Sequence, residues 1–139
     1  MKQCDIMIIS EEEVAFVSEQ ESLEKGVSFI RDNSDIKILF VTLGNKGSIA
    51  YYKDEKIYCG GIHQEHVVDT TGAGDTFCGA VLSRILELGT DALTEKDIRE
   101  MLLFANAAAS IVVTRKGALC SMPEPEEIRA ASSLIDKVL

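Results

Sequence analysis

The residues best suited to chemistry lie in a glycine-rich segment, Asp69–Phe77, with the sequence DTTGAGDTF. Its two glycines, Gly72 and Gly74, flank Ala73 and let the backbone turn tightly with consecutive N–H groups exposed. Apolar residues at helical spacing follow, so a helix N-terminus adds its partial positive charge at the same place. The segment therefore predicts a pocket for an anion such as a phosphate group.

One carboxylate, Asp75, stands at the mouth of this predicted pocket, where it would repel a phosphate. Its position is explained if it handles the proton of a hydroxyl group that attacks phosphorus. The segment is not a Walker loop, because no Lys-Ser/Thr pair follows at the required spacing, and Phe77 breaks the dinucleotide-binding glycine pattern. The plain structural alternative is a glycine turn in which Thr and Asp serve only as caps.

A second group of potentially reactive residues, Cys59, His63 and His66, invites a zinc interpretation. They supply at most three ligands, and no fourth follows at matching spacing, so we interpret them as a strand end followed by a loop. The four cysteines form no C-x-x-C pair and are expected to be reduced.

The elements that must position the glycine turn can be read from hydrophobic periodicity. Apolar runs predict buried strands, a polar break of three residues predicts a hairpin, and apolar residues at helical spacing predict helices. Strands interleaved with helices indicate an α/β fold, with a mostly parallel sheet and an appended antiparallel hairpin. The expected strands are 6–9, 36–43, 47–52 and 56–61. One helix is expected to run from residue 11 through Leu23 to Ile30, and further helices are expected at 77–88, 95–112 and 126–138.

Composition narrows the classes of partner. The chain has 139 residues, and 14 Lys+Arg against 23 Asp+Glu give a formal charge of −9, which repels nucleic acid and anionic membrane surfaces. No apolar run reaches the roughly 20 residues of a membrane-spanning helix, and the first residues lack the pattern of a secretory signal. We expect a cytoplasmic protein in which residues 1–139 form one unit or one piece of a unit, with no internal domain boundary.

Several segments in a fixed order together resemble one known family: 41–47 (VTLGNKG), 69–77 (DTTGAGDTF), 105–109 (ANAAA) and 113–118 (VTRKGA). By these segments, the chain is similar to the carboxyl-terminal half of the ribokinase-like, or phosphofructokinase-B type, carbohydrate kinases, most of all to fructokinases. The resemblance covers nearly the whole chain, and DTTGAGDTF is its most specific signature. It implies a single partial domain over residues 1–139 with a partial three-layer α/β/α fold.

By this resemblance, the chain takes part in the ATP-dependent phosphorylation of a sugar hydroxyl. Asp75 is implied to be the general base, and the amides of Gly72, Ala73 and Gly74 are implied to form the anion hole. Thr42, Gly44 and Gly47 match the family segment that approaches ATP, although a strand-to-hairpin turn is an equally good interpretation of these three alone. Asn106 matches a position near the adenine.

The family also binds metal ions beside the phosphates. For K⁺, the resemblance offers Asp69, Thr71, Gly117 and Ser121, with backbone carbonyls supplying several oxygens; turn capping by Asp69 and Ser121 is the alternative. For Mg²⁺, it offers Glu13, although Ser10 stands where the family usually has Asn.

Members of the family are much longer than this chain, and their amino-terminal portion carries most of the sugar pocket. We therefore expect the chain to be a carboxyl-terminal fragment of a sugar kinase, or a truncated reading frame. Three hypotheses follow: a fructokinase-like enzyme, with ribokinase or 2-keto-3-deoxygluconate kinase next; a nucleotide-binding module without turnover; and a fragment that associates through exposed sheet edges, including as a homodimer.

Overall fold

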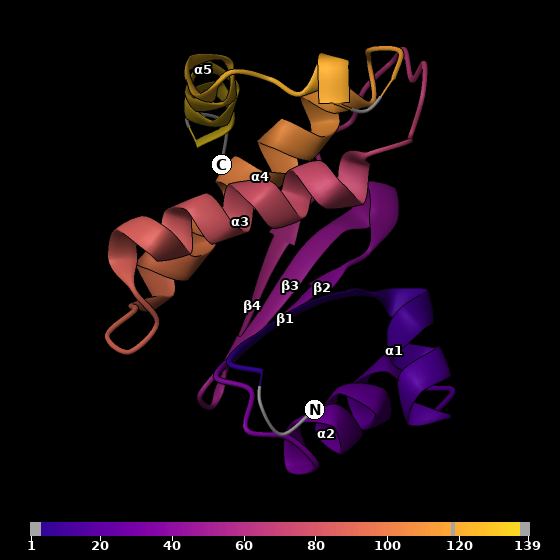
Figure 1. The fold of residues 1–139 in the computed structure, drawn as a ribbon, viewed down its shortest axis with the longest axis vertical. Helices are drawn as coiled ribbons and strands as arrows, with labels where there is room; N and C mark the ends of the chain where they lie inside the picture. Colours follow the sequence, from indigo (N-terminus) through magenta and orange to yellow (C-terminus); the bar gives the residue numbers. More distant parts are fainter. Residues whose placement is uncertain (1–3, 118, 137–139) are drawn as a thin grey trace.

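The computed structural model describes residues 4–117 and 119–136 and shows three layers, with a central sheet covered by helices on both faces (Figure 1). Helices α1 (Glu11–Ser18) and α2 (Leu23–Asp32) cover one face, and α3 (Ala73–Leu88) and α4 (Glu95–Val112) cover the other. Helix α5 (Pro125–Asp136) packs on α4. The expected partial α/β/α architecture is thus confirmed.

The sheet has four strands in the order β1-β2-β3-β4. Strands β1 and β2 are parallel, whereas β2 and β3, and β3 and β4, are antiparallel, so the sheet of the described chain is mixed. The appended antiparallel hairpin, β3 and β4, is confirmed. Two of the three strand pairings are antiparallel: the one within this hairpin and the one that joins β3 to β2. The strands are Ile6–Ser10, Ile38–Thr42, Gly47–Tyr52 and Glu55–Gly60.

The two parallel strands end side by side, because Ser10 of β1 pairs with Thr42 of β2. The carboxyl ends of parallel strands are where open α/β sheets bind ligands. A short 3-10 turn, η1 (Gly44–Lys46), follows β2 at this edge and leads directly into β3.

The first helical stretch differs from the expectation of one continuous helix. Helix α1 ends at Ser18, and Glu19 adopts a left-handed conformation with φ 55° that starts a new direction for α2. Gly26 of α2 allows the two helices to pack closely, because a Cβ there would lie 2.6 Å from Val14 Cγ1. The apolar spacing continued across the break because both helices present their buried residues to the same sheet face.

The helices of the other face follow the sequence signals closely. Thr94 and Asp97 form a complete capping box at the start of α4, and Gly89 ends α3 with φ 76°. Helix α5 begins at Pro125, one residue before the predicted start, and its expected last residues, 137 and 138, lie outside the described part of the chain.

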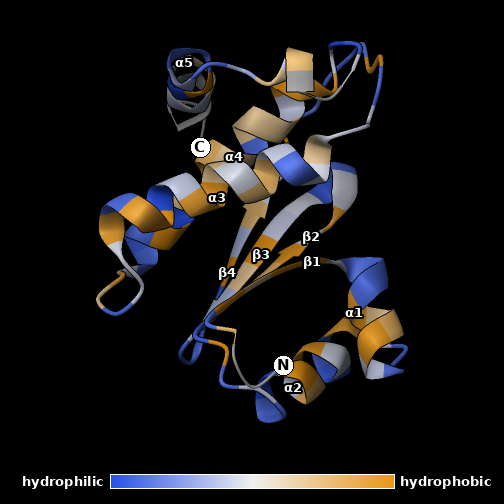
Figure 2. Cartoon of the chain, in the orientation of Figure 1, coloured by the Kyte–Doolittle hydropathy of each residue, from blue (hydrophilic) through white to orange (hydrophobic). Residues whose placement is uncertain are grey.

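Two apolar clusters, one on each side of the sheet, hold the layers together (Figure 2). Alternate residues along β2 divide between them: Ile38 and Phe40 face α3 and α4, whereas Leu39 and Val41 face α1 and α2. Ala107 and Ala108 are fully buried on α4, and their small side chains allow α4 to approach its neighbours closely. This alternation is the period-2 pattern of a strand covered on both faces.

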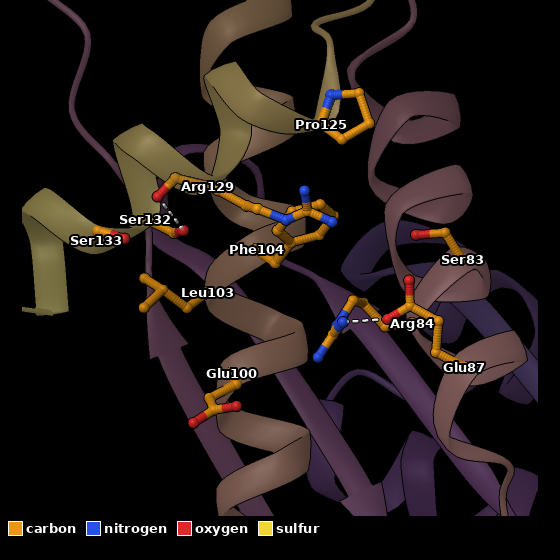
Figure 3. A pocket seen from close by; sticks show the side chains of 10 residues that line it. All are labelled: Ser83, Arg84, Glu87, Glu100, Leu103, Phe104, Pro125, Arg129, Ser132 and Ser133. Carbon is orange, nitrogen blue, oxygen red and sulfur yellow. Dashed lines mark hydrogen bonds and ion pairs between the residues drawn. The ribbon is translucent and has the colours of Figure 1, made fainter.

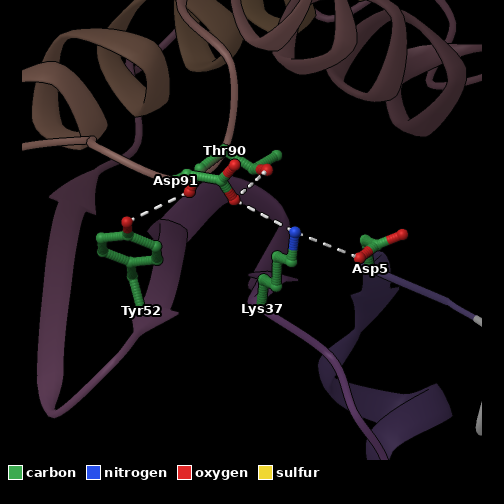
Figure 4. A network of polar contacts seen from close by, with 5 residues as sticks. All are labelled: Asp5, Lys37, Tyr52, Thr90 and Asp91. Carbon is green, nitrogen blue, oxygen red and sulfur yellow. Dashed lines mark hydrogen bonds and ion pairs between the residues drawn. The ribbon is translucent and has the colours of Figure 1, made fainter.

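A polar network joins the opposite end of the sheet to the loop between α3 and α4 (Figure 4). Lys37 Nζ lies 3.5 Å from Asp5 Oδ1 and 3.1 Å from Asp91 Oδ1, and the Tyr52 hydroxyl donates to the Thr90 carbonyl at 3.1 Å. Asp91 raises the pKa of Lys37 above its ordinary value. These charges are exposed, so they orient the loop more than they stabilise the fold.

Within the described ranges, none of the helices combines the length and apolar character needed to traverse a lipid bilayer.

Candidate active site

A cavity of about 400 Å³ opens where β2 ends and α3 begins. Its walls come from segments far apart in the sequence: the end of β2 and turn η1, the chain after β4, the start of α3, and the last turns of α4. Six residues selected from the sequence line it: Thr42, Gly44, Gly47, Ala73, Gly74 and Asn106. The glycine turn and the segment expected to approach ATP therefore face one common space.

The glycine turn has the geometry expected of an anion site. Gly72 adopts a left-handed conformation with φ 82° immediately before α3, a conformation that favours glycine. A Cβ added at Gly74 would meet no atom within 4 Å, so the backbone of this residue is open to an incoming group. The first amides of a helix lack carbonyl partners within it, although Ala73 N–H donates to the Thr70 carbonyl at a long 3.3 Å.

Asp75 lies in the first turn of α3 but does not line the cavity. Asp75 is exposed to solvent, whereas Ala73, Gly74 and Phe77 of the same helix line the cavity. The structure thus brings Asp75 next to the cavity wall without directing it into the space that the other candidates share. Gly72 also lies outside the lining residues.

Asn106 is the buried polar residue that joins α4 to the sheet at this cavity. It is 7% exposed; its Oδ1 accepts from Ser48 Oγ at 2.9 Å, and its Nδ2 donates to the Cys59 and Gly60 carbonyls, each at 3.2 Å. One side chain therefore fixes the start of β3 and the end of β4. Its amide is committed to the protein, which makes positioning of the wall its evident structural contribution.

Gly47 and Gly61 allow the two strands of the hairpin to meet at the cavity. A Cβ at Gly47 would lie 2.1 Å from the Cys59 carbonyl oxygen, and one at Gly61 would lie 2.1 Å from the Asn45 carbonyl oxygen. Backbone atoms cannot withdraw as a flexible side chain can, so both positions require glycine. Gly44 differs, since it has φ 60° but open space around it.

The four residues suggested for K⁺ lie together beside the turn. The Asp69 carboxylate accepts from Thr71 N–H at 2.9 Å and from Gly117 N–H at 3.3 Å, and Ser121 Oγ donates to the Gly117 carbonyl. Hydrogen bonds from Thr71, and then from Gly117, lower the pKa of Asp69 below its ordinary value. The carboxylate thus remains ionised at neutral pH, and the loop after α4 is tied to the turn before α3.

Glu13 lies at the start of α1 rather than in the cavity wall. Ser10 N–H donates to Glu13 Oε2 at 2.8 Å, and Glu13 N–H donates to Ser10 Oγ at 3.1 Å, which is a complete capping box. Ser10 is well suited to this role, because serine is a preferred N-cap. The box leaves Glu13 close to the shared end of β1 and β2.

Several cavity residues were not assigned to a nucleotide site from the sequence. His63 was considered only as a zinc ligand and Gln64 was not singled out; both lie in an irregular segment without periodicity. Ala109 was interpreted as a packing residue of a helix, and Ser110 was not singled out. Position is the remaining signal: His63 and Gln64 come shortly after Gly60 and Gly61, and Ala109 and Ser110 follow Asn106 by one helical turn. In the part of the chain that the structure describes, no cluster of three or more His, Cys, Asp or Glu is arranged to hold a metal.

Comparison with known proteins gives a consistent result. Residues 1–125 match the pfkB family of carbohydrate kinases. Fructokinase-1 of Oryza sativa subsp. japonica is 38% identical over 128 residues, which cover 91% of this chain and 39% of the rice protein. The structure of fructokinase from Vibrio cholerae O395 bound to fructose, ADP and a calcium ion superposes with a TM-score of 0.81 at 32% identity, covering 91% of this chain and 40% of that one.

Two further structures extend the comparison. A double mutant of the Vibrio cholerae enzyme has been solved with fructose, ADP and a potassium ion. Arabidopsis thaliana ribokinase complexed with ribose and ATP superposes with a TM-score of 0.75 at 33% identity, over 92% of this chain and 40% of that one. The ribokinase-like fold is therefore shown, and the chain spans about two fifths of the length of these relatives.

Proposed function

The chain belongs to the pfkB family of carbohydrate kinases, and from this premise we propose that it forms the nucleotide side of an ATP-dependent sugar kinase. One observation carries the proposal: six residues chosen from separate sequence segments line one cavity that opens at the N-terminus of α3. A helix N-terminus with exposed amides stabilises phosphate oxygens, and open glycine backbone permits their close approach.

The cavity lining combines polar and apolar residues, and the helix N-terminus indicates how ATP would lie in it. Gly74 and the start of α3 would take the phosphates, since the positive end of the helix is there. Apolar lining residues would take the base; they include Ala109 and Val113 at the end of α4, and Ile62 and Val67 in the chain after β4. Nucleotide sites commonly combine such an apolar lining with a few placed polar groups.

Asp75 is proposed as the general base that accepts the proton of the sugar hydroxyl. In a loose phosphoryl-transfer transition state the nucleophile keeps its proton until late, so the position of the carboxylate is what matters most.

Two metal ions belong to the proposal. The cluster of Asp69, Thr71, Gly117 and Ser121 is proposed to hold K⁺ beside the anion hole, supported by its ionised carboxylate and by the potassium-bound form of the Vibrio cholerae relative. Mg²⁺ would enter with ATP, and Glu13 would help to order its water ligands at the shared end of β1 and β2. If K⁺ binds, exchanging KCl for tetramethylammonium chloride should lower the thermal midpoint of the chain, and Asp69→Asn should remove the difference.

The test of nucleotide binding uses two glycines of α3. Cβ atoms at Gly74 and Gly79 would both meet open space, so Gly74→Ala and Gly79→Ala should each fold normally and gain up to about 1 kcal/mol in helix propensity. Of these two glycines, Gly74 lines the cavity and Gly79 does not. Isothermal titration with MgATP should therefore show about tenfold weaker binding, or about 1.4 kcal/mol, for Gly74→Ala and wild-type affinity for Gly79→Ala. Equal affinities of the two variants would refute the placement of the phosphates.

The test of turnover needs an intact kinase that carries this segment. There Asp75→Asn should abolish sugar-dependent release of ADP while sparing the binding of ATP. Near-normal turnover would remove the assignment of Asp75. Fructose is the proposed substrate on the strength of the fructokinase relatives, with ribose and 2-keto-3-deoxygluconate as the other candidates for the same assay.

A second candidate function is a nucleotide-binding module without turnover. It is favoured by one observation, namely that the residues matched to ATP binding line one cavity although the chain spans only about two fifths of the length of its relatives. Binding of MgATP by the 139-residue chain without sugar-dependent release of ADP would support the module, and turnover by the chain itself would exclude it.

A further inference from the structure

A second cavity, of about 350 Å³, lies between α3, α4 and α5 (Figure 3). It is separate from the first, because α4 presents Glu100, Leu103 and Phe104 to it and Asn106, Ala109 and Ser110 to the other. The α4 residues that line the second cavity come earlier along the helix, so this cavity contacts different turns of α4 from the first. Its volume is at the lower end of the range for small-molecule sites, about 300 to 1,000 Å³.

Among the described side chains around this cavity, one arginine has no ion-pair partner. Arg84 pairs with Glu87, and Glu100 pairs with Lys96 at 3.6 Å. Among the side chains that the structure describes, no carboxylate forms an ion pair with Arg129, which extends from α5 into the cavity (Figure 3). A guanidinium group offers a planar fork of N–H donors that matches a carboxylate.

The remaining lining residues restrict the ligand further. Leu103, Phe104 and Pro125 provide apolar contact surface beside Arg129. The Ser83 and Ser132 hydroxyls donate to carbonyls of their own helices at 2.8 and 3.1 Å, so they add little to the binding of an anion.

Two carboxylates, Glu87 and Glu100, border the same space. They would repel a multiply charged anion more strongly than a singly charged one. We propose that this cavity binds a small organic monocarboxylate, whose carboxylate pairs with Arg129 and whose apolar body lies on Leu103 and Phe104.

The proposal is tested by titrating the ¹⁵N-labelled full chain with benzoate, without nucleotide, so that the outcome does not depend on the binding of ATP. Benzoate should shift amide resonances of α3, α4 and α5 around the cavity in a saturable manner. Arg129→Gln should weaken its binding about ten- to hundredfold, the loss expected for a charged hydrogen-bonding partner. Arg99→Gln is the matched control, since Arg99 is an exposed arginine of α4 outside the cavity.

A second variant and two further probes keep the result independent of folding defects in α5. Glu100→Gln should strengthen the binding of benzoate by a few fold, because it removes a repelling charge. Benzyl alcohol should bind about tenfold more weakly than benzoate, since it lacks the charge. Unchanged benzoate affinity in Arg129→Gln, shifts confined to other parts of the chain, absence of saturable binding, or sulfate binding as tightly as benzoate would each overturn the proposal.

Discussion

Replacing Asn106 by alanine should destabilise the chain by about 2 to 4 kcal/mol. The figure follows from its contacts: the variant loses an accepted hydrogen bond from Ser48 Oγ and donated bonds to the Cys59 and Gly60 carbonyls. A net hydrogen bond contributes about 1 kcal/mol, and a buried polar group left without a partner costs about 1 to 3 kcal/mol. Ser48 is 0% exposed, so its hydroxyl is the group that bears this penalty.

The measurement is urea unfolding followed by circular dichroism, with the free energy of unfolding extrapolated to water. Ser110→Ala is the matched control, because Ser110 lies on the same helix, is 7% exposed, and makes one local bond to the Ala107 carbonyl at 2.8 Å. It should cost about 1 kcal/mol or less. Ser48→Ala combined with Asn106→Ala should cost less than the sum of the two single variants, because the pair shares one bond.

Two results would refute this reasoning. One is a cost for Asn106→Ala no larger than that of Ser110→Ala, which would mean that the buried amide does not hold the two strand ends. The other is strict additivity of the Ser48 and Asn106 variants, which would mean that their side chains do not interact. A loss of 2 to 4 kcal/mol is a large fraction of the roughly 5 to 15 kcal/mol by which domains are stable, so the difference from the control is readily measured.

Two further predictions concern acid stability and association. The pKa of Asp69 is lowered in the folded chain by Thr71, so its contribution to stability is complete above the ordinary aspartate pKa of about 3.9 and disappears as the pH falls through the lower folded value. Below about pH 4, the free energy of unfolding in urea should therefore fall less for Asp69→Asn than for the wild type. An equal fall in both proteins would contradict this. Phe16 of α1 and Leu86 of α3 are 85% and 88% exposed, one on each side of the sheet, and we expect the chain to associate through these two exposed apolar side chains. The double variant Phe16→Ser, Leu86→Ser should shift sedimentation equilibrium toward the monomer, whereas Met122→Ser, at a 39% exposed residue, should not; equal effects would exclude these two side chains as the cause.

Much of the fold was accessible from the sequence because its signals are local. The hairpin was predicted from the polar break at 53–55, and the start of α4 from the capping residues Thr94 and Asp97. The break between α1 and α2 was missed, because Glu19 adopts its left-handed conformation without the glycine that usually marks one. Periodicity alone cannot separate one helix from two that bury the same face.

The candidate site was predicted unevenly for a related reason. Gly74 was found because glycine spacing is visible in a sequence, and Thr42 through the resemblance of 41–47 to a family segment; the structure places both at one cavity. His63 and Gln64 were not assigned to the cavity because they line it from an irregular segment, where the side-chain direction depends on the close approach of Gly61 to Asn45. Such tertiary contacts leave no pattern in the segment itself.

The position of Asp75 outside the cavity agrees with in-line transfer of a phosphoryl group. Ala73, Gly74 and Phe77 share the face of α3 that lines the cavity, and Asp75 lies on the exposed side of the same turn. In-line displacement requires the attacking hydroxyl and the leaving group to lie on opposite sides of the phosphorus atom. If ATP fills the cavity, we infer that the sugar reaches the phosphate from the exposed side of the turn, where Asp75 stands. A carboxylate inside the cavity would instead face the triphosphate and repel it.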